Sequence, residues 1–192
     1  TGYICQKPKQ DDREQIRKQL NLTSENKLIV VSAGGGSFGY RILEAAIKAN
    51  AVLKSSELRM QVFTGPYLDK NKFTELTQLA APGTNVERFS ENFPAWLAAA
   101  DLSISMGGYN TTMNVIAAGT PALIFPYSHD REQGLRAKRL APLANLTILK
   151  EKDLAPALLA QKITGILEQH AKTPSVQLDG AEQTADYLTK ST

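Results

Sequence analysis

The sequence predicts an α/β fold in which a Rossmann-like parallel sheet is covered by helices on both faces. Short apolar runs rich in β-branched residues alternate with amphipathic segments along almost the whole chain. Two of the apolar runs end in glycine-rich loops, and a helical pattern follows each loop. Strands that alternate with helices in this way form βαβ units, which place their strands parallel in one sheet.

The composition is that of a globular domain. The 192 residues are 42% hydrophobic and 21% charged, so the chain can bury one sizeable core. A net charge of +3 permits an anionic ligand but does not indicate a nucleic-acid partner. The one cysteine, Cys5, excludes an intramolecular disulfide, and we expect a reducing, cytoplasmic setting. No apolar run is long enough for a membrane span, and no Cys/His cluster suggests a metal.

Local patterns predict each element in turn. Residues 27–33 (KLIVVSA) are a β-branched run that stops at glycines, which indicates a buried strand. A second strand over 58–64 ends at a Gly-Pro pair. The other predicted strands are 85–90, 102–106, 122–125 and 146–149, and the predicted helices are 40–50, 69–79, 93–100, 111–118, 131–140, 154–167 and 176–188. We expect about five to seven parallel strands in one domain over 13–192, after a linker-like polar stretch over 1–12.

The first glycine loop, residues 34–39 (GGGSFG), lies between a predicted strand and a predicted helix. Glycines let the backbone approach a ligand, and a helix N-terminus attracts anions, so the loop favours a phosphate site over a plain tight turn. The spacing of Gly34, Gly36 and Gly39 is also typical of a dinucleotide-binding domain. Such a domain needs an acidic residue at the end of its second strand, and residues 62–65 (VFTG) contain none. This disfavours NAD as a cofactor.

The second glycine loop, Gly107-Gly108, precedes another predicted helix. A diphosphate could bind at that helix N-terminus, with the Thr111 and Thr112 hydroxyls as further donors. Alternatively Asn110 or Thr111 is a plain N-cap, a role that is compatible with phosphate binding. Both loops follow strands of one parallel sheet, and ligands gather at the carboxyl edge of such sheets.

A third polar cluster follows the strand over 122–125. Asp130 and Gln133 are three residues apart at the start of a predicted helix, which is the spacing of an N-cap and its capping-box partner. Their side chains could instead bind sugar hydroxyls. The spacing alone favours the cap.

Two strings together, GGGSFGYRIL and SMGGYNTTMNVIAAGTPALIFPYSHDREQGLRAKRL, resemble the C-terminal domain of glycosyltransferase family 28. The resemblance extends over about residues 27–167. It implies one half of a GT-B fold, the half that binds a nucleotide-sugar donor, commonly a UDP-sugar. The acceptor and the catalytic base then belong to an N-terminal domain absent from this chain, so the catalytic residue is unknown and the isolated chain is expected to be inactive.

The resemblance also implies a set of donor-binding residues. Those around the first glycine loop would face the diphosphate or the sugar, and the backbone of Ser90 would meet the nucleobase. The residues of the second glycine loop would bind the diphosphate, and those of the third cluster the sugar. The full set is Gly35, Gly36, Ser37, Ser90, Gly108, Tyr109, Asn110, Thr111, Asn114, Asp130, Glu132 and Gln133.

Asn114 departs from the family pattern, which usually has a glutamate there that binds both ribose hydroxyls. An amide accepts only at its oxygen, so this substitution predicts weaker or altered nucleotide binding. Peripheral membrane association of the full-length protein is compatible with the resemblance. Two alternatives remain: a GT-B nucleotide-sugar epimerase, and a non-catalytic subunit that completes a site with a partner chain.

Overall fold

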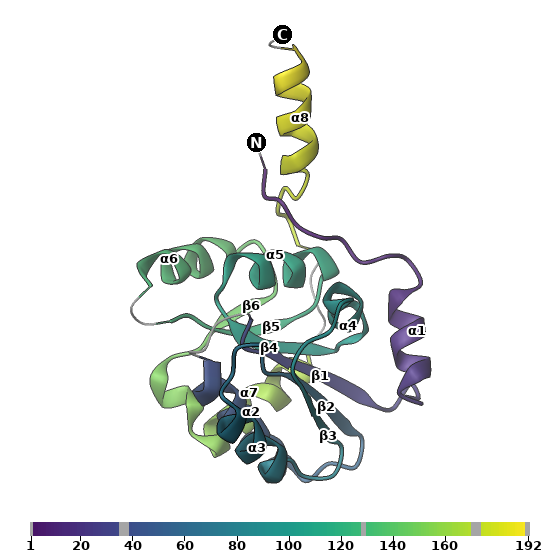
Figure 1. Ribbon diagram of the computed structural model, residues 1–192, viewed down its shortest axis with the longest axis vertical. Coiled ribbons are helices and arrows are strands. Elements are labelled where there is room, and N and C mark those ends of the chain that lie inside the picture. The colour runs from purple at the N-terminus through teal and green to yellow at the C-terminus, as the bar shows by residue number, and fades with distance from the viewer. Residues whose placement is uncertain (1, 35–38, 128–129, 170–173, 191–192) are drawn as a thin grey trace.

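The computed structural model describes residues 2–34, 39–127, 130–169 and 174–190. In these residues six parallel strands form one sheet in the order β3-β2-β1-β4-β5-β6 (Figure 1). The strands are β1 (Lys27–Ser32), β2 (Leu58–Phe63), β3 (Thr84–Glu87), β4 (Leu102–Met106), β5 (Ala122–Phe125) and β6 (Leu146–Ile148). The helices are α1 (Asp12–Gln19), α2 (Tyr40–Leu53), α3 (Lys70–Leu79), α4 (Phe93–Ala99), α5 (Tyr109–Ala118), α6 (Arg131–Leu140), the 3-10 helix η2 (Glu151–Leu154), α7 (Pro156–Leu167) and α8 (Gly180–Lys190). The predicted α/β class, with a parallel sheet of about five to seven strands, is confirmed.

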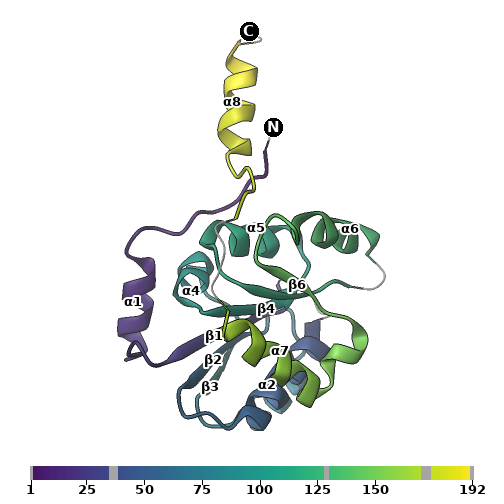
Figure 2. The ribbon, with the colours of Figure 1, turned by 180° about the vertical axis from the view of Figure 1, so that it is seen from behind.

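Helices cover both faces of the sheet (Figure 2). On one face α2, α3 and α7 pack on side chains such as Ile29 and Val31 of β1. On the other face α1, α4, α5 and α6 pack on the alternate residues Leu28 and Val30. Successive side chains of a strand point to opposite faces, so one β-branched run contributes to two cores. This is why residues 27–33 are hydrophobic without alternation.

Several predicted boundaries differ from the observed ones. β3 stops at Glu87 rather than Ser90, because its partner β2 ends at Phe63, which is paired with Glu87. α5 begins at Tyr109, two residues before the predicted start, and α8 begins at Gly180 rather than at 176. The Gly65 N–H still donates to the Arg88 carbonyl, so the chain leaves the sheet only after Arg88.

α1 was not predicted, because it has only one buried apolar residue, Ile16. Ion pairs add to the packing of Ile16. Arg13 and Arg17 both pair with the carboxylate of Asp101, which also accepts a hydrogen bond from the backbone N–H of Leu28. One carboxylate thus ties α1 to β1, the central strand of the sheet.

The two ends of the chain lie side by side and extend away from the sheet (Figure 1). The Tyr3 N–H donates to the Gln177 carbonyl, and the Gly180 N–H donates to the Tyr3 carbonyl. The segment expected to be a linker is thus paired with the C-terminal segment through Tyr3. Among the described residues, no helix is both long and apolar enough to span a membrane.

Candidate functional site: two adjoining cavities at the carboxyl edge of the sheet

The strand order places both glycine loops beside each other. β1 and β4 are adjacent and parallel, with Ser32 paired to Ser105, so the loops that follow them leave the same edge. β1 is also the point where the strand order reverses, and ligands of open α/β sheets bind in the crevice at that point. Gly34, Gly39 and Gly108 line one cavity, as the prediction of a shared edge requires.

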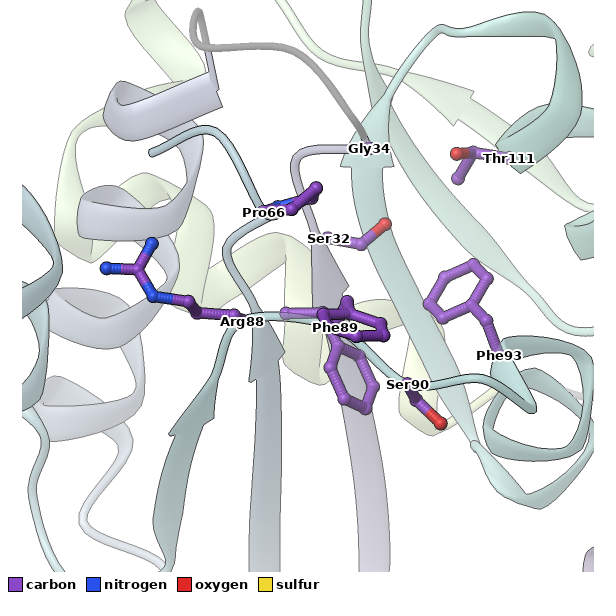
Figure 3. Close-up of a pocket in the computed structure, with 10 residues that line it drawn as sticks. Ser32, Gly34, Pro66, Arg88, Phe89, Ser90, Phe93 and Thr111 are labelled. Carbon is purple, nitrogen blue, oxygen red and sulfur yellow. The ribbon is translucent and has the colours of Figure 1, made fainter. Parts of the chain in front are cut away.

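The first cavity, called here the aromatic cavity, has a volume of about 200 Å³ (Figure 3). Phenylalanine rings from three separate segments form its apolar walls. Its lining residues are Ser32, Gly34, Phe63, Gly65, Pro66, Arg88, Phe89, Ser90, Phe93 and Thr111. Phe63 is fixed by edge-to-face contacts with Phe93 and with the core residue Trp96, at centroid distances of 5.8 and 5.3 Å. A flat aromatic ligand is the group that such walls accommodate.

The polar residues of the aromatic cavity differ in their availability. The guanidinium of Arg88 turns away from it (Figure 3), donates to the Leu68 carbonyl and lies over the Phe73 ring. The Ser90 hydroxyl accepts a hydrogen bond from the backbone N–H of Asn92. This bond holds the Ser90 side chain locally and leaves its O–H free to donate.

The second cavity, called here the helix-end cavity, has a volume of about 300 Å³. It lies at the N-terminus of α5 and is lined by Ala33, Gly34, Gly39, Met106, Gly108, Tyr109, Asn110, Thr111, Tyr127 and Gln133. Gly108 is the N-cap of α5, and among the described residues no side chain caps this end. The plain-cap alternative for Asn110 and Thr111 is therefore wrong. The uncapped N–H groups and the helix dipole suit an anion such as a diphosphate.

The two cavities adjoin, because Gly34 and Thr111 line both of them. Gly34 has a φ of +69°, a left-handed conformation that favours glycine. A Cβ atom at Gly34 would lie 3.8 Å from the Thr111 hydroxyl oxygen. The absence of a side chain at Gly34 keeps the passage between the cavities open. The predicted residues Gly35, Gly36 and Ser37 of the same loop lie outside the described residues.

The third cluster has structural partners. The Asp130 carboxylate caps α6 by accepting from the N–H groups of Glu132 and Gln133, at 2.9 and 3.2 Å, so the predicted cap is confirmed. The Gln133 side chain does not complete a capping box, since its oxygen accepts from the Tyr127 N–H at 3.1 Å. Gln133 lines the helix-end cavity, whereas Asp130 lines a separate surface pocket along α6.

Sequence reasoning missed Arg136, which joins α6 to the second glycine loop. Its guanidinium pairs with Glu132, donates to the Gly107 carbonyl at 3.2 Å and lies 5.4 Å from the centroid of the Tyr109 ring. Glu132, predicted to contact the sugar, is thus paired one turn along its own helix. The i, i+4 spacing of Glu132 and Arg136 on a predicted helix is the sequence signal that could have indicated this ion pair. Arg136 thus places an ion-paired guanidinium next to Gly107, at the edge of the helix-end cavity.

The N-terminal segment contacts two predicted donor-binding residues of α5. The Ile4 N–H donates to the Tyr109 hydroxyl at 3.1 Å, and the Gln6 N–H donates to the Asn114 side-chain oxygen at 3.2 Å. Asn114 lines neither cavity. Its side-chain oxygen already accepts one hydrogen bond within the chain, and its placement at a ribose stays a prediction.

Tyr40, which directly follows the first glycine loop, is not poised to act as a base. Burial, followed by a 2.9 Å hydrogen bond donated to Glu75 and the charges of Glu44 and Glu75, raises the pKa of Tyr40 to about 12. The hydroxyl stays protonated at neutral pH and links α2 to α3. Within the described part of the chain, no three His, Cys, Asp or Glu side chains gather as a metal site would require.

A parallel sheet in this order, with two glycine loops and adjoining cavities at its carboxyl edge, defines a Rossmann-like domain of the kind found in GT-B glycosyltransferases. The sequence profile of the glycosyltransferase family 28 C-terminal domain matches residues 28–187. The chain belongs to this family.

Curated relatives and solved structures agree with this assignment. UDP-N-acetylglucosamine--N-acetylmuramyl-(pentapeptide) pyrophosphoryl-undecaprenol N-acetylglucosamine transferase of Haemophilus influenzae (strain 86-028NP) is 28% identical over 195 residues, which cover 94% of this chain and 53% of that protein. The enzyme of the same name from Agrobacterium fabrum is 24% identical, over 80% of this chain and 43% of that protein. The chain thus spans about half the length of these relatives.

Two solved glycosyltransferases show the shared fold. MurG of Acinetobacter baumannii superposes with a TM-score of 0.67 at 20% identity, over 94% of this chain and 52% of that one. The calicheamicin glycosyltransferase CalG4 superposes with a TM-score of 0.64 at 20% identity, over 78% of this chain and 36% of that one. Identities this low establish the fold alone.

Proposed function

We propose that this chain is the donor-binding domain of a glycosyltransferase and that it binds a UDP-sugar across the two adjoining cavities. The observation that supports this most is the meeting of an aromatic-walled cavity and an uncapped helix N-terminus at Gly34 and Thr111. A nucleotide has the matching sequence of groups: a flat base, a ribose and a diphosphate. The curated relatives that match the chain carry UDP-N-acetylglucosamine in their names.

In this arrangement the base lies between the phenylalanine rings, within reach of the Ser90 backbone. The diphosphate lies at the first turn of α5, where the N–H groups of Tyr109, Asn110 and Thr111 point towards it. Gly108 lets the chain approach the phosphates, because no atom lies within 4 Å of a Cβ built on it. The sugar extends towards Gln133, which lines the same cavity.

The chemistry proposed for this domain is stabilisation of a leaving group. Transfer of the sugar to an acceptor hydroxyl breaks the bond to the diphosphate, and negative charge develops on its oxygen. Backbone N–H groups that are already oriented by α5 stabilise that charge without rearranging. Arg136 donates to the Gly107 carbonyl and is ion-paired with Glu132, so it holds the second glycine loop at this end of the cleft. The acceptor site and the catalytic base belong to a further domain in this proposal.

Isothermal titration of the chain with UDP, UDP-N-acetylglucosamine, GDP and dTDP tests the proposal. We expect saturable binding of UDP and its sugar, with weaker binding of GDP because its base is larger. Lack of binding to every nucleoside diphosphate in the panel would refute the proposed function. Preference for GDP would refute the uridine assignment and leave the nucleotide site standing.

Removal of the Phe89 ring is expected to weaken UDP binding about tenfold. Phe89 lines the aromatic cavity although 60% of it is exposed, so its loss should leave the fold intact. Stacking of a base on an aromatic side chain contributes about 1–3 kcal/mol, and each 1.4 kcal/mol corresponds to about a factor of ten. Titration of Phe89→Ala with UDP measures the effect. Leu158→Ala, an exposed site on α7 across the sheet, is the control and should bind as the wild type does.

A further inference from the structure

The hydroxyl of Ser32 lies at the aromatic cavity and has no role in the nucleobase contacts proposed above. Ser32 is the last residue of β1, is only 3% exposed, and lines the cavity. Its hydroxyl has no hydrogen-bond partner among the described residues. In Figure 3 the Ser32 side chain leaves its strand on the side of Thr111 and Phe93. A buried hydroxyl without a partner is unfavourable, so one that faces a cavity indicates a ligand group there.

Burial alone does not distinguish Ser32. Ser103 and Ser105 of β4 are also fully buried, and their hydroxyls likewise have no partner in the described part of the chain. Neither of these two residues lines the aromatic cavity. Ser103 therefore offers a matched comparison: the same residue type, on the neighbouring strand and equally buried, but without access to the cleft.

The position of Ser32 along the cleft indicates which part of a nucleotide it meets. Gly34 and Thr111 line both cavities, so the group that connects base to diphosphate, the ribose, lies beside them. The Thr111 side chain points its hydroxyl into the same region as Ser32 (Figure 3). The Asn114 oxygen, in contrast, accepts from Gln6 outside both cavities.

We infer that Ser32, together with Thr111, binds the ribose hydroxyls of the nucleotide and so makes the site selective for ribonucleotides. This inference rests on the proposed function, because it assumes a nucleotide in the cleft. The Ser32 hydroxyl can both donate to and accept from a ribose hydroxyl, and Thr111 offers the same from the opposite wall. Ribose recognition is thereby placed at the end of β1 and the first turn of α5.

The test is titration of wild type, Ser32→Ala and Ser103→Ala with UDP and with its 2′-deoxy and 3′-deoxy forms. We expect Ser32→Ala to bind UDP about fivefold more weakly, the loss of one neutral hydrogen bond. Ser103→Ala should bind as the wild type does. The wild type should discriminate against at least one deoxy form, and Ser32→Ala should lose most of that discrimination. Thermal unfolding should show both variants at least as stable as the wild type, because each loses a buried, unpaired hydroxyl.

The outcomes separate this inference from the proposed function. Wild-type binding of UDP with an unchanged affinity in Ser32→Ala would overturn the inference and leave the nucleotide site in place. A weaker Ser32→Ala variant that keeps the full discrimination between UDP and its deoxy forms would overturn the ribose assignment. No UDP binding by the wild-type chain would refute the proposed function, and the role of Ser32 with it.

Discussion

Gly34→Val is expected to weaken nucleotide binding by roughly 100-fold or more, which corresponds to a loss of about 2.7 kcal/mol in binding free energy. Gly34 lines both cavities, and a Cβ atom there would already lie 3.8 Å from the Thr111 hydroxyl oxygen. The two methyl groups of valine would extend further into the passage that a nucleotide must cross. A β-branched residue is also strained at a φ of +69°. Titration of the folded variant with UDP measures the loss.

Gly119→Val is the control for the strain that valine experiences in a left-handed backbone conformation. Gly119 has the same φ of +69° at the end of α5, and no atom lies within 4 Å of a Cβ built there. Gly119→Val should therefore lose a similar stability, about 1–2 kcal/mol for a left-handed residue, yet bind UDP normally. Equal affinities in the two variants would show that the passage at Gly34 is not part of a binding site.

Trp96→Ala is expected to destabilise the domain by about 3–5 kcal/mol, the usual cost of deleting a buried aromatic side chain. Trp96 is 6% exposed and belongs to the core between the sheet and α4, α5 and α6. It also packs edge to face on Phe63, a wall of the aromatic cavity. Trp96 is the only tryptophan, so its variants lack tryptophan fluorescence. Urea unfolding of the wild type and of both variants should therefore be followed by circular dichroism.

Trp96→Phe is the matched variant, because it keeps an aromatic ring in the same core position. We expect it to lose much less stability than Trp96→Ala, since a smaller cavity is left. A loss below about 1 kcal/mol in Trp96→Ala would mean that the contact with Phe63 is not part of a packed core. Because Phe63 connects core and cavity, the alanine variant should also bind UDP more weakly under conditions where it is folded.

The sheet could be predicted because its signals are local. The β-branched run over 27–33 and the glycines after it define β1 and the loop without reference to any distant residue. Boundaries failed where the cause was not local. β3 ends at Glu87 because β2 ends opposite it. α5 begins at Tyr109 with Gly108 as its N-cap, although a threonine or an asparagine is the stronger sequence signal for an N-cap. α1 depends on a carboxylate at Asp101, far along the chain.

The candidate site was predictable only in part, for the same reason. The second glycine loop predicts a helix N-terminus, and α5 begins there. The aromatic cavity has no sequence signature, because Phe63, Phe89 and Phe93 come from a strand end, a loop and a helix that only the fold brings together. Asn114 lies in a motif that indicates a ligand, and its oxygen also accepts from the Gln6 N–H, 108 residues away, a contact that no local pattern predicts.

The most direct test of the nucleotide site is amide chemical-shift mapping of the isotopically labelled chain during titration with UDP. We expect the largest shifts in two groups that are distant in sequence: Phe89 and Ser90 at the aromatic cavity, and Tyr109 to Thr111 at the first turn of α5. Both groups should saturate with one dissociation constant, since one ligand spans both cavities. Shifts confined to the surface pocket along α6, around Leu135 and Lys138, or no saturable shift at all, would contradict this expectation.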